Sequence, residues 1–179
     1  MPELNSAGSG PKPAAGESTA PHQGSGNVSG STFDVDDAAT YEFTKEVLTQ
    51  LAALTPGSYL HIGGDESHVT PHNKYVTMVD AFSRQVNDLD KTVIGWNEYS
   101  SANLPAGSVV QYWNRGLQQA ADRILANDSK VILSPASKTY IPQRQDNSET
   151  VGGTWACGGP YTLANHYNWD TGDFPSRRW

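Results

Sequence analysis

The sequence predicts an α/β fold built from parallel βα units, and three observations support this. Short apolar runs of strand length recur along the chain. Longer segments lie between them, and their apolar residues repeat at helical spacing. Clusters of Gly, Pro and polar residues separate the segments. Strands that alternate with helices are typical of a parallel sheet, because each parallel strand needs a crossover connection.

The N-terminal stretch carries no periodic pattern. Residues 1–32 are dominated by Gly, Ser, Pro and Ala, and neither period 2 nor period 3.6 is present. We therefore expect a loop or disordered lead-in over residues 1–32, followed by one α/β domain over residues 33–179.

The first periodic segment starts near position 37. Its apolar residues recur at helical spacing as far as Leu54, and Asp36 or Asp37 can cap the helix. The Thr-Pro-Gly sequence at 55–57 should end it. The next run, residues 59–62, is typical of a short buried strand that ends at a Gly-Gly pair.

The same alternation continues as far as Pro135. Further helices are expected within residues 69–90 and at 117–127, and further strands at 92–96, 108–113 and 130–134. The strands at 92–96 and 108–113 are expected to be joined without a full helix. Residues 136–179 are predicted to be long loop with little secondary structure.

Charge and composition narrow the classes of partner. The formal net charge is −7 and no basic run exists, which argues against nucleic acid or an anionic membrane as partner. No apolar run reaches the roughly 18 residues of a membrane span. The single cysteine, Cys157, cannot form an internal disulfide. His68 and His72 have the spacing of a helical metal pair, but Pro71 between them favours a turn or a helix start, so we expect no metal site.

Residues with functional character follow three predicted strands: an Asp-Glu pair at 65–66, Trp96 and Trp113. The carboxyl ends of parallel strands meet at one edge of the sheet, so these side chains should surround one site. The Gly-Gly pair at 63–64 lets the backbone bend there. Carboxylates between aromatic rings suit a carbohydrate, and glycoside hydrolysis commonly uses paired carboxylates. Taken alone, an Asp-Glu pair is more often solvated surface and a Trp more often core.

The hexapeptide His-Ile-Gly-Gly-Asp-Glu at 61–66 resembles the signature of glycoside hydrolase family 20, the β-N-acetylhexosaminidases. Other segments follow the family pattern too, so nearly the whole chain is covered: residues 2–5, 41–56, 93–96, 110–113, 132–135, 140 and 167–170. The resemblance implies a partial (β/α)₈ TIM barrel over residues 33–179, roughly strands 4 to 7 with the preceding loop. A complete barrel takes roughly 250 residues, and this chain has 179.

The resemblance also implies an activity. The family removes terminal non-reducing β-linked GlcNAc or GalNAc by substrate-assisted retaining hydrolysis. A glycan ending in N-acetylhexosamine, or a chitooligosaccharide, is the implied substrate, and no cofactor is implied. Glu66 is the implied general acid/base, and Asp65 orients the acetamido nitrogen of the substrate.

The same resemblance assigns the residues that bind the sugar. Tyr140 is expected to donate a hydrogen bond to the acetamido oxygen. Trp96, Trp113 and Trp155 are expected to wall the site around that group. His61 is expected to support it by hydrogen bonding rather than to react. Without the resemblance, Tyr140 would be taken as structural.

The chain also departs from the family pattern. Many members carry an aspartate two residues after the tyrosine, to contact sugar hydroxyls, whereas this chain has Pro142 there. Gln143 and Arg144 are the candidates to replace that contact. Because the first and last barrel strands are not recognised, we expect the isolated chain to be unstable or inactive. A sugar-binding remnant without catalysis and a non-functional fragment are the alternatives. The family implies an exported or lysosomal enzyme, although no signal peptide is recognised, and oligomeric state stays open.

Overall fold

The chain forms an α/β structure around a four-stranded parallel sheet. The computed structural model describes residues 22–24, 31–114, 124, 128–154 and 159–172. The sheet order is β3-β4-β5-β6 and every neighbouring pair is parallel. The strands are β3 (Tyr59–His61), β4 (Thr92–Trp96), β5 (Val109–Tyr112) and β6 (Lys130–Leu133). The predicted α/β class with a parallel sheet is confirmed.

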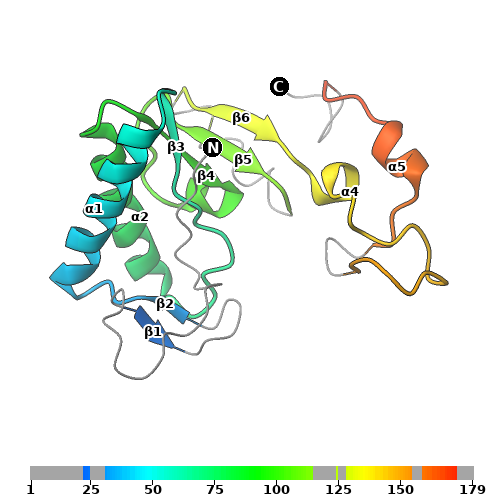
Figure 1. Ribbon diagram of the computed structural model, residues 1–179, viewed down its shortest axis with the longest axis horizontal. Helices are drawn as coiled ribbons and strands as arrows, with labels where there is room; N and C mark the ends of the chain where they lie inside the picture. The colour runs from blue at the N-terminus through cyan, green and yellow to red at the C-terminus, as the bar shows by residue number, and fades with distance from the viewer. Residues whose placement is uncertain (1–21, 25–30, 115–123, 125–127, 155–158, 173–179) are drawn as a thin grey trace.

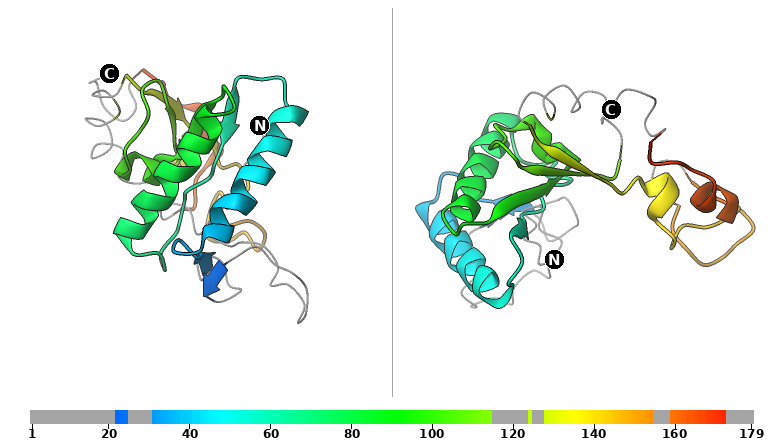
Figure 2. Two further views of the ribbon diagram at one scale, coloured as in Figure 1. Left: turned by 90° about the vertical axis from the view of Figure 1, so that its left-hand side faces the viewer. Right: turned by 90° about the horizontal axis from the view of Figure 1, so that it is seen from above.

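Two long helices lie side by side and pack with the sheet (Figures 1 and 2). Helix α1 (Ala38–Leu54) begins where the Asp37 carboxylate accepts the Ala39 N–H at 2.9 Å, so Asp37 is the cap. It ends at Thr55, whose extended backbone (φ −118°, ψ 114°) is the conformation that a following proline imposes. Helix α2 (His72–Asn87) lies within the predicted range and begins directly after Pro71, which is one of the two alternatives that the sequence left open there.

The hydrophobic core lies between these helices and the sheet. Phe82 of α2 is 1% exposed, and its ring meets that of Phe33 edge-on at 6.0 Å and that of Tyr41 at 6.3 Å. Residues from all these elements have no exposed surface, namely Leu48, Leu60, Met78, Val86 and Val110. Close packing in this core therefore holds the strands whose ends carry the candidate site residues.

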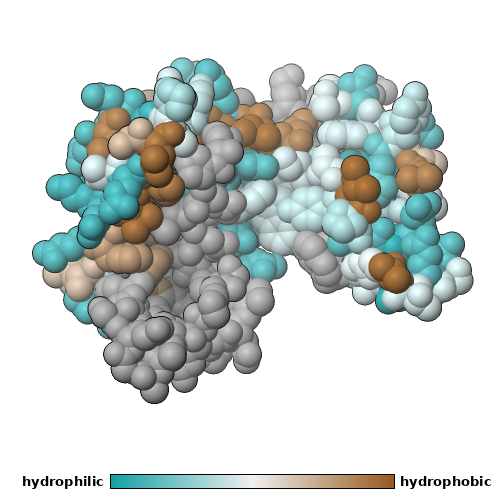
Figure 3. Space-filling model, viewed as in Figure 1, coloured by the Kyte–Doolittle hydropathy of each residue, from teal (hydrophilic) through white to brown (hydrophobic). Residues whose placement is uncertain are grey.

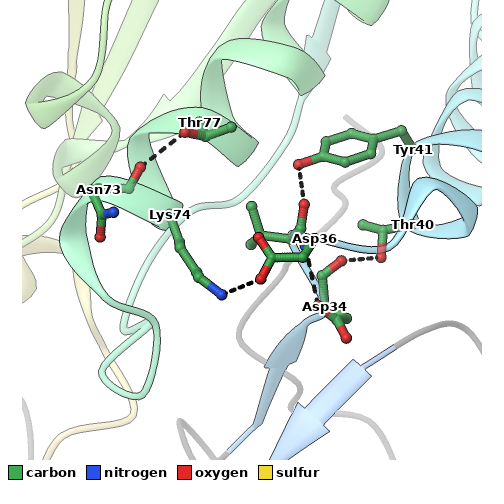
Figure 4. A network of polar contacts seen from close by, with 8 residues as sticks. Asp34, Asp36, Thr40, Tyr41, Asn73, Lys74 and Thr77 are labelled. Atoms are coloured by element: carbon green, nitrogen blue, oxygen red, sulfur yellow. Dashed lines mark hydrogen bonds and ion pairs between the residues drawn. The ribbon is translucent and has the colours of Figure 1, made fainter.

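A polar network joins the chain before α1 to both helices (Figure 4). Lys74 of α2 forms an ion pair with Asp36. The Tyr41 hydroxyl of α1 donates to the Val35 carbonyl at 2.7 Å. The Asp36 N–H donates to the Asp34 carboxylate at 3.1 Å, which shapes the turn. These contacts hold the entry to α1 against the start of α2.

The described residues before α1 differ from the expectation of a loop or disordered lead-in over residues 1–32. Strands β1 (His22–Gly24) and β2 (Ser31–Phe33) form a short antiparallel pair. Strands of three residues are too short for an apolar alternation to appear in the sequence. Their pairing satisfies backbone groups without needing such a pattern.

The connection between β4 and β5 follows the prediction. A 3₁₀ helix, η1 (Asn97–Ser101), links β4 to the loop before β5 in place of a full helix. The helix expected at 117–127 lies outside the described residues, except that Ile124 is helical and buried. After β6, two short helices, α4 (Ala136–Thr139) and α5 (Leu163–Tyr167), interrupt a segment whose other described residues lie in neither a helix nor a strand.

The segment after β6 lies beyond the sheet, on the side away from α1 and α2 (Figure 1). It exposes aliphatic side chains (Figure 3), and Ile141, Val151 and Leu163 are each more than half exposed. None of the helices in the described ranges has the length and apolar character needed to cross a membrane.

Candidate active site

The turn after β3 places the Asp-Glu pair. We call residues 63–66 the strand-end turn. Gly63 (φ 72°), Gly64 (φ 95°) and Glu66 (φ 46°) all have left-handed backbones. The Gly63 carbonyl accepts the Trp96 N–H at 2.9 Å, so the turn starts beside the end of β4. Glycine adopts this conformation readily, whereas for Glu66 it costs on the order of 1 kcal/mol, so surrounding contacts must hold it.

Tyr75 of α2 holds the strand-end turn through a hydrogen bond. Its hydroxyl donates to the Gly64 carbonyl at 2.6 Å, and the residue is 6% exposed. A Cβ at Gly64 would lie 3.0 Å from that hydroxyl, so the close approach favours glycine. Burial, with the negative charges of Glu98 and Asp65 nearby, raises the pKa of Tyr75 far above its usual value. The hydroxyl therefore stays protonated and remains a donor.

His61, the last residue of β3, also contacts the strand-end turn. Its Nδ1 accepts the Gly63 N–H at 3.0 Å, so this nitrogen carries no proton. The ring is 4% exposed and meets the Trp96 ring at 5.0 Å with an interplanar angle of 63°. The imidazole thus contacts both the backbone of the turn and an aromatic residue of the neighbouring strand.

The structure brings three of the predicted sugar-binding residues together. The rings of Trp113 and Tyr140 are stacked, with centroids 6.2 Å apart and planes 11° apart. Trp96 and Tyr140 pack against the cluster formed by Trp113 and the buried Ala136. Trp113 is 6% exposed, and the other two rings are half-buried. Trp155 lies outside the described residues.

Asn97 and Glu98, directly after β4, hydrogen-bond to the residues that follow β5, and the sequence analysis missed both. The Asn97 side-chain oxygen accepts the backbone N–H of Trp113 at 3.2 Å and of Asn114 at 3.3 Å. The Glu98 carboxylate accepts the indole N–H of Trp113 at 3.2 Å. The signal available was their position, because they follow Trp96 at the carboxyl end of a parallel strand.

Glu98 is also an electrostatic neighbour of Glu66. Burial is the main cause that raises the pKa of Glu98 above its usual value. Hydrogen bonds from its own N–H, from the Trp113 indole and from the Glu66 backbone N–H act in the opposite direction, and the charge of Glu66 adds to the rise. Glu66 and Glu98 therefore form an interacting pair of carboxylates beside the ring of Trp113. Among the described residues, no group of three or more His, Cys, Asp or Glu side chains could hold a metal ion.

The residues around Pro142 are engaged within their own loop. Gln143 is 4% exposed, and its backbone pairs with Gly153. The Arg144 Nε donates to the Gly152 carbonyl at 3.1 Å. The guanidinium therefore braces the loop that follows α4.

The fold and the arrangement of these residues define an α/β protein with a candidate site at the carboxyl edge of a parallel sheet, and comparison with known proteins gives its family. The model of the glycosyl hydrolase family 20 catalytic domain matches residues 2–177. The chain belongs to this family.

Two relatives show the extent of the likeness. The chain is 40% identical to a β-N-acetylhexosaminidase of Cellulomonas fimi over 136 residues, which is 75% of this chain and 27% of the relative. It is 25% identical to a β-hexosaminidase of Emericella nidulans over 187 aligned positions, covering 77% of this chain and 30% of the relative. The chain thus spans less than a third of either protein.

Solved structures of the family share the fold. A GH20 β-N-acetylhexosaminidase from Streptomyces coelicolor A3(2) matches with a TM-score of 0.75 and 37% identity, over 83% of this chain and 31% of that one. A mutant Streptomyces plicatus β-hexosaminidase in complex with its product GlcNAc matches with a TM-score of 0.75 and 35% identity, over 83% and 30%. The parallel sheet and its helices therefore follow the arrangement in family 20 TIM-barrel enzymes.

Proposed function

We propose that the protein is an exo-acting β-N-acetylhexosaminidase that removes terminal non-reducing β-linked GlcNAc or GalNAc from glycans or chitooligosaccharides. One observation carries the proposal. In a chain that belongs to family 20, Asp65 and Glu66 lie in the strand-end turn after β3, and the Gly63 carbonyl of this turn accepts the backbone N–H of Trp96. This is the carboxyl edge of a parallel sheet, where TIM-barrel enzymes carry their catalytic residues.

The proposed reaction proceeds through the substrate's own acetamido group. The acetamido carbonyl oxygen attacks the anomeric carbon, the bond from that carbon to the leaving oxygen breaks, and Glu66 gives that oxygen its proton. A cyclic oxazolinium-type intermediate results. Glu66, now a carboxylate, then takes a proton from water, and the water oxygen attacks the anomeric carbon and reopens the ring. Asp65 holds the acetamido N–H, which keeps the carbonyl oxygen aimed at the anomeric carbon.

The aromatic cluster is the proposed site for the acetamido group and the sugar face. Flat rings bind the apolar face of a sugar, and a tyrosine hydroxyl can donate to the acetamido oxygen. The stacking of Trp113 on Tyr140, and the packing of Trp96 against the cluster of Trp113 and Ala136, support this assignment. In the same scheme, His61 orients the strand-end turn through Gly63.

The sheet has a proposed place in the family fold. We assign β3 to β6 as strands 4 to 7 of a (β/α)₈ barrel, with residues 33–179 in the catalytic domain and residues 1–32 as a lead-in segment. The consecutive order of the four parallel strands supports this assignment. The likeness to about a third of a family 20 enzyme, at a TM-score of 0.75, also supports it.

The test uses the protein that carries this sequence, expressed at its full length. Release of nitrophenol from nitrophenyl N-acetyl-β-glucosaminide should be seen for the unmodified protein. Glu66→Gln should lower kcat on the order of 10²- to 10⁴-fold, the usual contribution of a general acid/base. Asp65→Asn should also lower kcat, because the acetamido group loses its orienting charge.

Glu42→Gln provides the matched control, since Glu42 is an exposed carboxylate on α1, far along the chain from the strand-end turn. It should leave kcat unchanged. A folded protein that releases no nitrophenol would contradict the proposed function. So would a Glu66→Gln variant as active as the Glu42→Gln control.

A further inference from the structure

Glu98 stands at the junction of three parts of the candidate site. It belongs to η1, directly after β4. It accepts the indole N–H of Trp113, which follows β5, at 3.2 Å. It also accepts the backbone N–H of Glu66, in the turn after β3. A single carboxylate therefore joins the ends of three neighbouring strands.

The contact with Glu66 falls where the backbone most needs support. Glu66 is not a glycine, yet its φ is 46°. A left-handed residue of this kind persists only when neighbouring groups hold it. Hydrogen bonds to an ionised carboxylate are roughly twice as strong as neutral ones, so Glu98 can fix the orientation of the peptide that precedes the Glu66 side chain.

The contact with Trp113 fixes the other side of the Glu98 carboxylate. Trp113 is 6% exposed and stacks on Tyr140, so its indole is held firmly by its neighbours. Asn97 adds a hydrogen bond to the Trp113 backbone at 3.2 Å. Glu98 is thus tied to a fixed aromatic ring on one side and to the strand-end turn on the other.

We propose that Glu98 is a positioning residue for Glu66, whose carboxylate holds the acid/base residue at a set distance from the aromatic cluster by accepting the Glu66 backbone N–H and the Trp113 indole N–H together. This inference rests on the proposed function, because it gives Glu66 the proton transfer. Glu98 itself does not exchange a proton with the substrate. It acts on the step in which Glu66 protonates the leaving oxygen.

A role in positioning the acid predicts a dependence on the leaving group that a merely structural role does not. A dinitrophenolate leaves without being protonated, whereas a phenolate needs the proton that Glu66 gives. Displacing the acid should therefore slow the phenyl substrate much more than the dinitrophenyl one. Misplacement by about 1 Å can lower a rate on the order of 100-fold.

The experiment measures kcat and KM of the full-length protein on phenyl and dinitrophenyl N-acetyl-β-glucosaminide. Glu98→Leu removes both hydrogen-bond acceptors. It should lower kcat on the phenyl substrate about 10- to 100-fold and on the dinitrophenyl substrate less than about 3-fold, with little change in KM. Glu98→Gln keeps an acceptor oxygen and should show a smaller loss with the same dependence on the leaving group. Glu42→Gln, at an exposed position of α1, should match the unmodified protein on both substrates.

Equal losses on the two substrates, or no loss in either Glu98 variant, would overturn the inference while leaving the proposed function intact. If circular dichroism shows that Glu98→Leu does not fold, the nearly isosteric Glu98→Gln variant decides by the same comparison. Inactivity of the folded, unmodified protein on both substrates would instead overturn the proposed function, and the inference with it.

Discussion

Removing one hydroxyl tests whether the strand-end turn depends on α2. Tyr75→Phe deletes the donor that reaches the Gly64 carbonyl at 2.6 Å and leaves the ring in place. The residue is 6% exposed, so water cannot readily replace the lost hydrogen bond. The raised pKa of Tyr75 keeps this donor protonated at every pH at which the protein would be assayed.

The size of the effect follows from that burial. Leaving a buried carbonyl without its donor costs about 1 to 3 kcal/mol. With a urea m-value of about 2 kcal/mol per molar, a loss of about 2 kcal/mol moves the unfolding midpoint down by about 1 M. Because Gly64 directly precedes Asp65 in the strand-end turn, we expect kcat to fall as well under the proposed function.

Urea unfolding followed by circular dichroism measures the change. Tyr59→Phe is the control, since Tyr59 starts the strand that leads to the same turn but is 39% exposed. It should change the free energy of unfolding by less than about 0.5 kcal/mol, as surface substitutions usually do. If Tyr75→Phe is no more destabilising than Tyr59→Phe, the hydrogen bond does not support the turn and the reasoning fails.

Three further predictions concern stability, measured by urea unfolding. Gly95→Ala would place a Cβ 2.7 Å from the Tyr99 ring and should lower the free energy of unfolding by about 1 to 3 kcal/mol. Gly57→Ala, where a Cβ would meet no atom within 4 Å, should leave it unchanged. Equal effects of the two substitutions would contradict the close packing at Gly95. Phe82→Ala removes a ring that is 1% exposed and should cost about 3 to 5 kcal/mol, so a loss below about 1 kcal/mol would argue against a tight core. Because the folded protein raises the pKa of Glu98, it binds that proton more tightly than the unfolded chain does. The resulting stability is present at low pH and lost as pH rises through the raised pKa; Glu98→Gln should remove this fall, and an unchanged pH dependence would contradict it.

The long elements were predictable because their side chains carry the periodicity. Helices α1 and α2 show a repeated apolar face. Asp37 caps the start of α1, Thr55 caps its end, and Pro71 directly precedes α2, so local effects on the backbone mark these ends. The pair β1 and β2 was not predictable, since three residues are too few for a pattern.

The candidate site divides in a similar way. Four of its residues were predictable from their places after the predicted strands, because parallel topology gathers the strand ends at one edge of the sheet. These residues are Asp65, Glu66, Trp96 and Trp113. Contacts that depend on three-dimensional packing could not be found this way. The Tyr75 hydroxyl reaches a carbonyl eleven residues earlier in the chain, although the helical spacing marks Tyr75 only as part of an inner face.

The contacts of Glu98 were also not predictable from the sequence. It lies two residues after Trp96, so its place at the strand edge is visible in the sequence. Its direction depends on the 3₁₀ turn of η1, and a short turn of this kind has no periodic signature. Only the structure shows that its carboxylate faces Trp113 rather than solvent.

The central claim is that Asp65 and Glu66 serve a nucleophile that belongs to the substrate. The most direct measurement compares kcat/KM of the full-length protein on nitrophenyl N-acetyl-β-glucosaminide and on nitrophenyl β-glucoside, which carries a hydroxyl in place of the acetamido group. We predict hydrolysis of the first and no measurable hydrolysis of the second, because the second substrate cannot supply the attacking oxygen. Comparable kcat/KM values on both substrates would contradict the account.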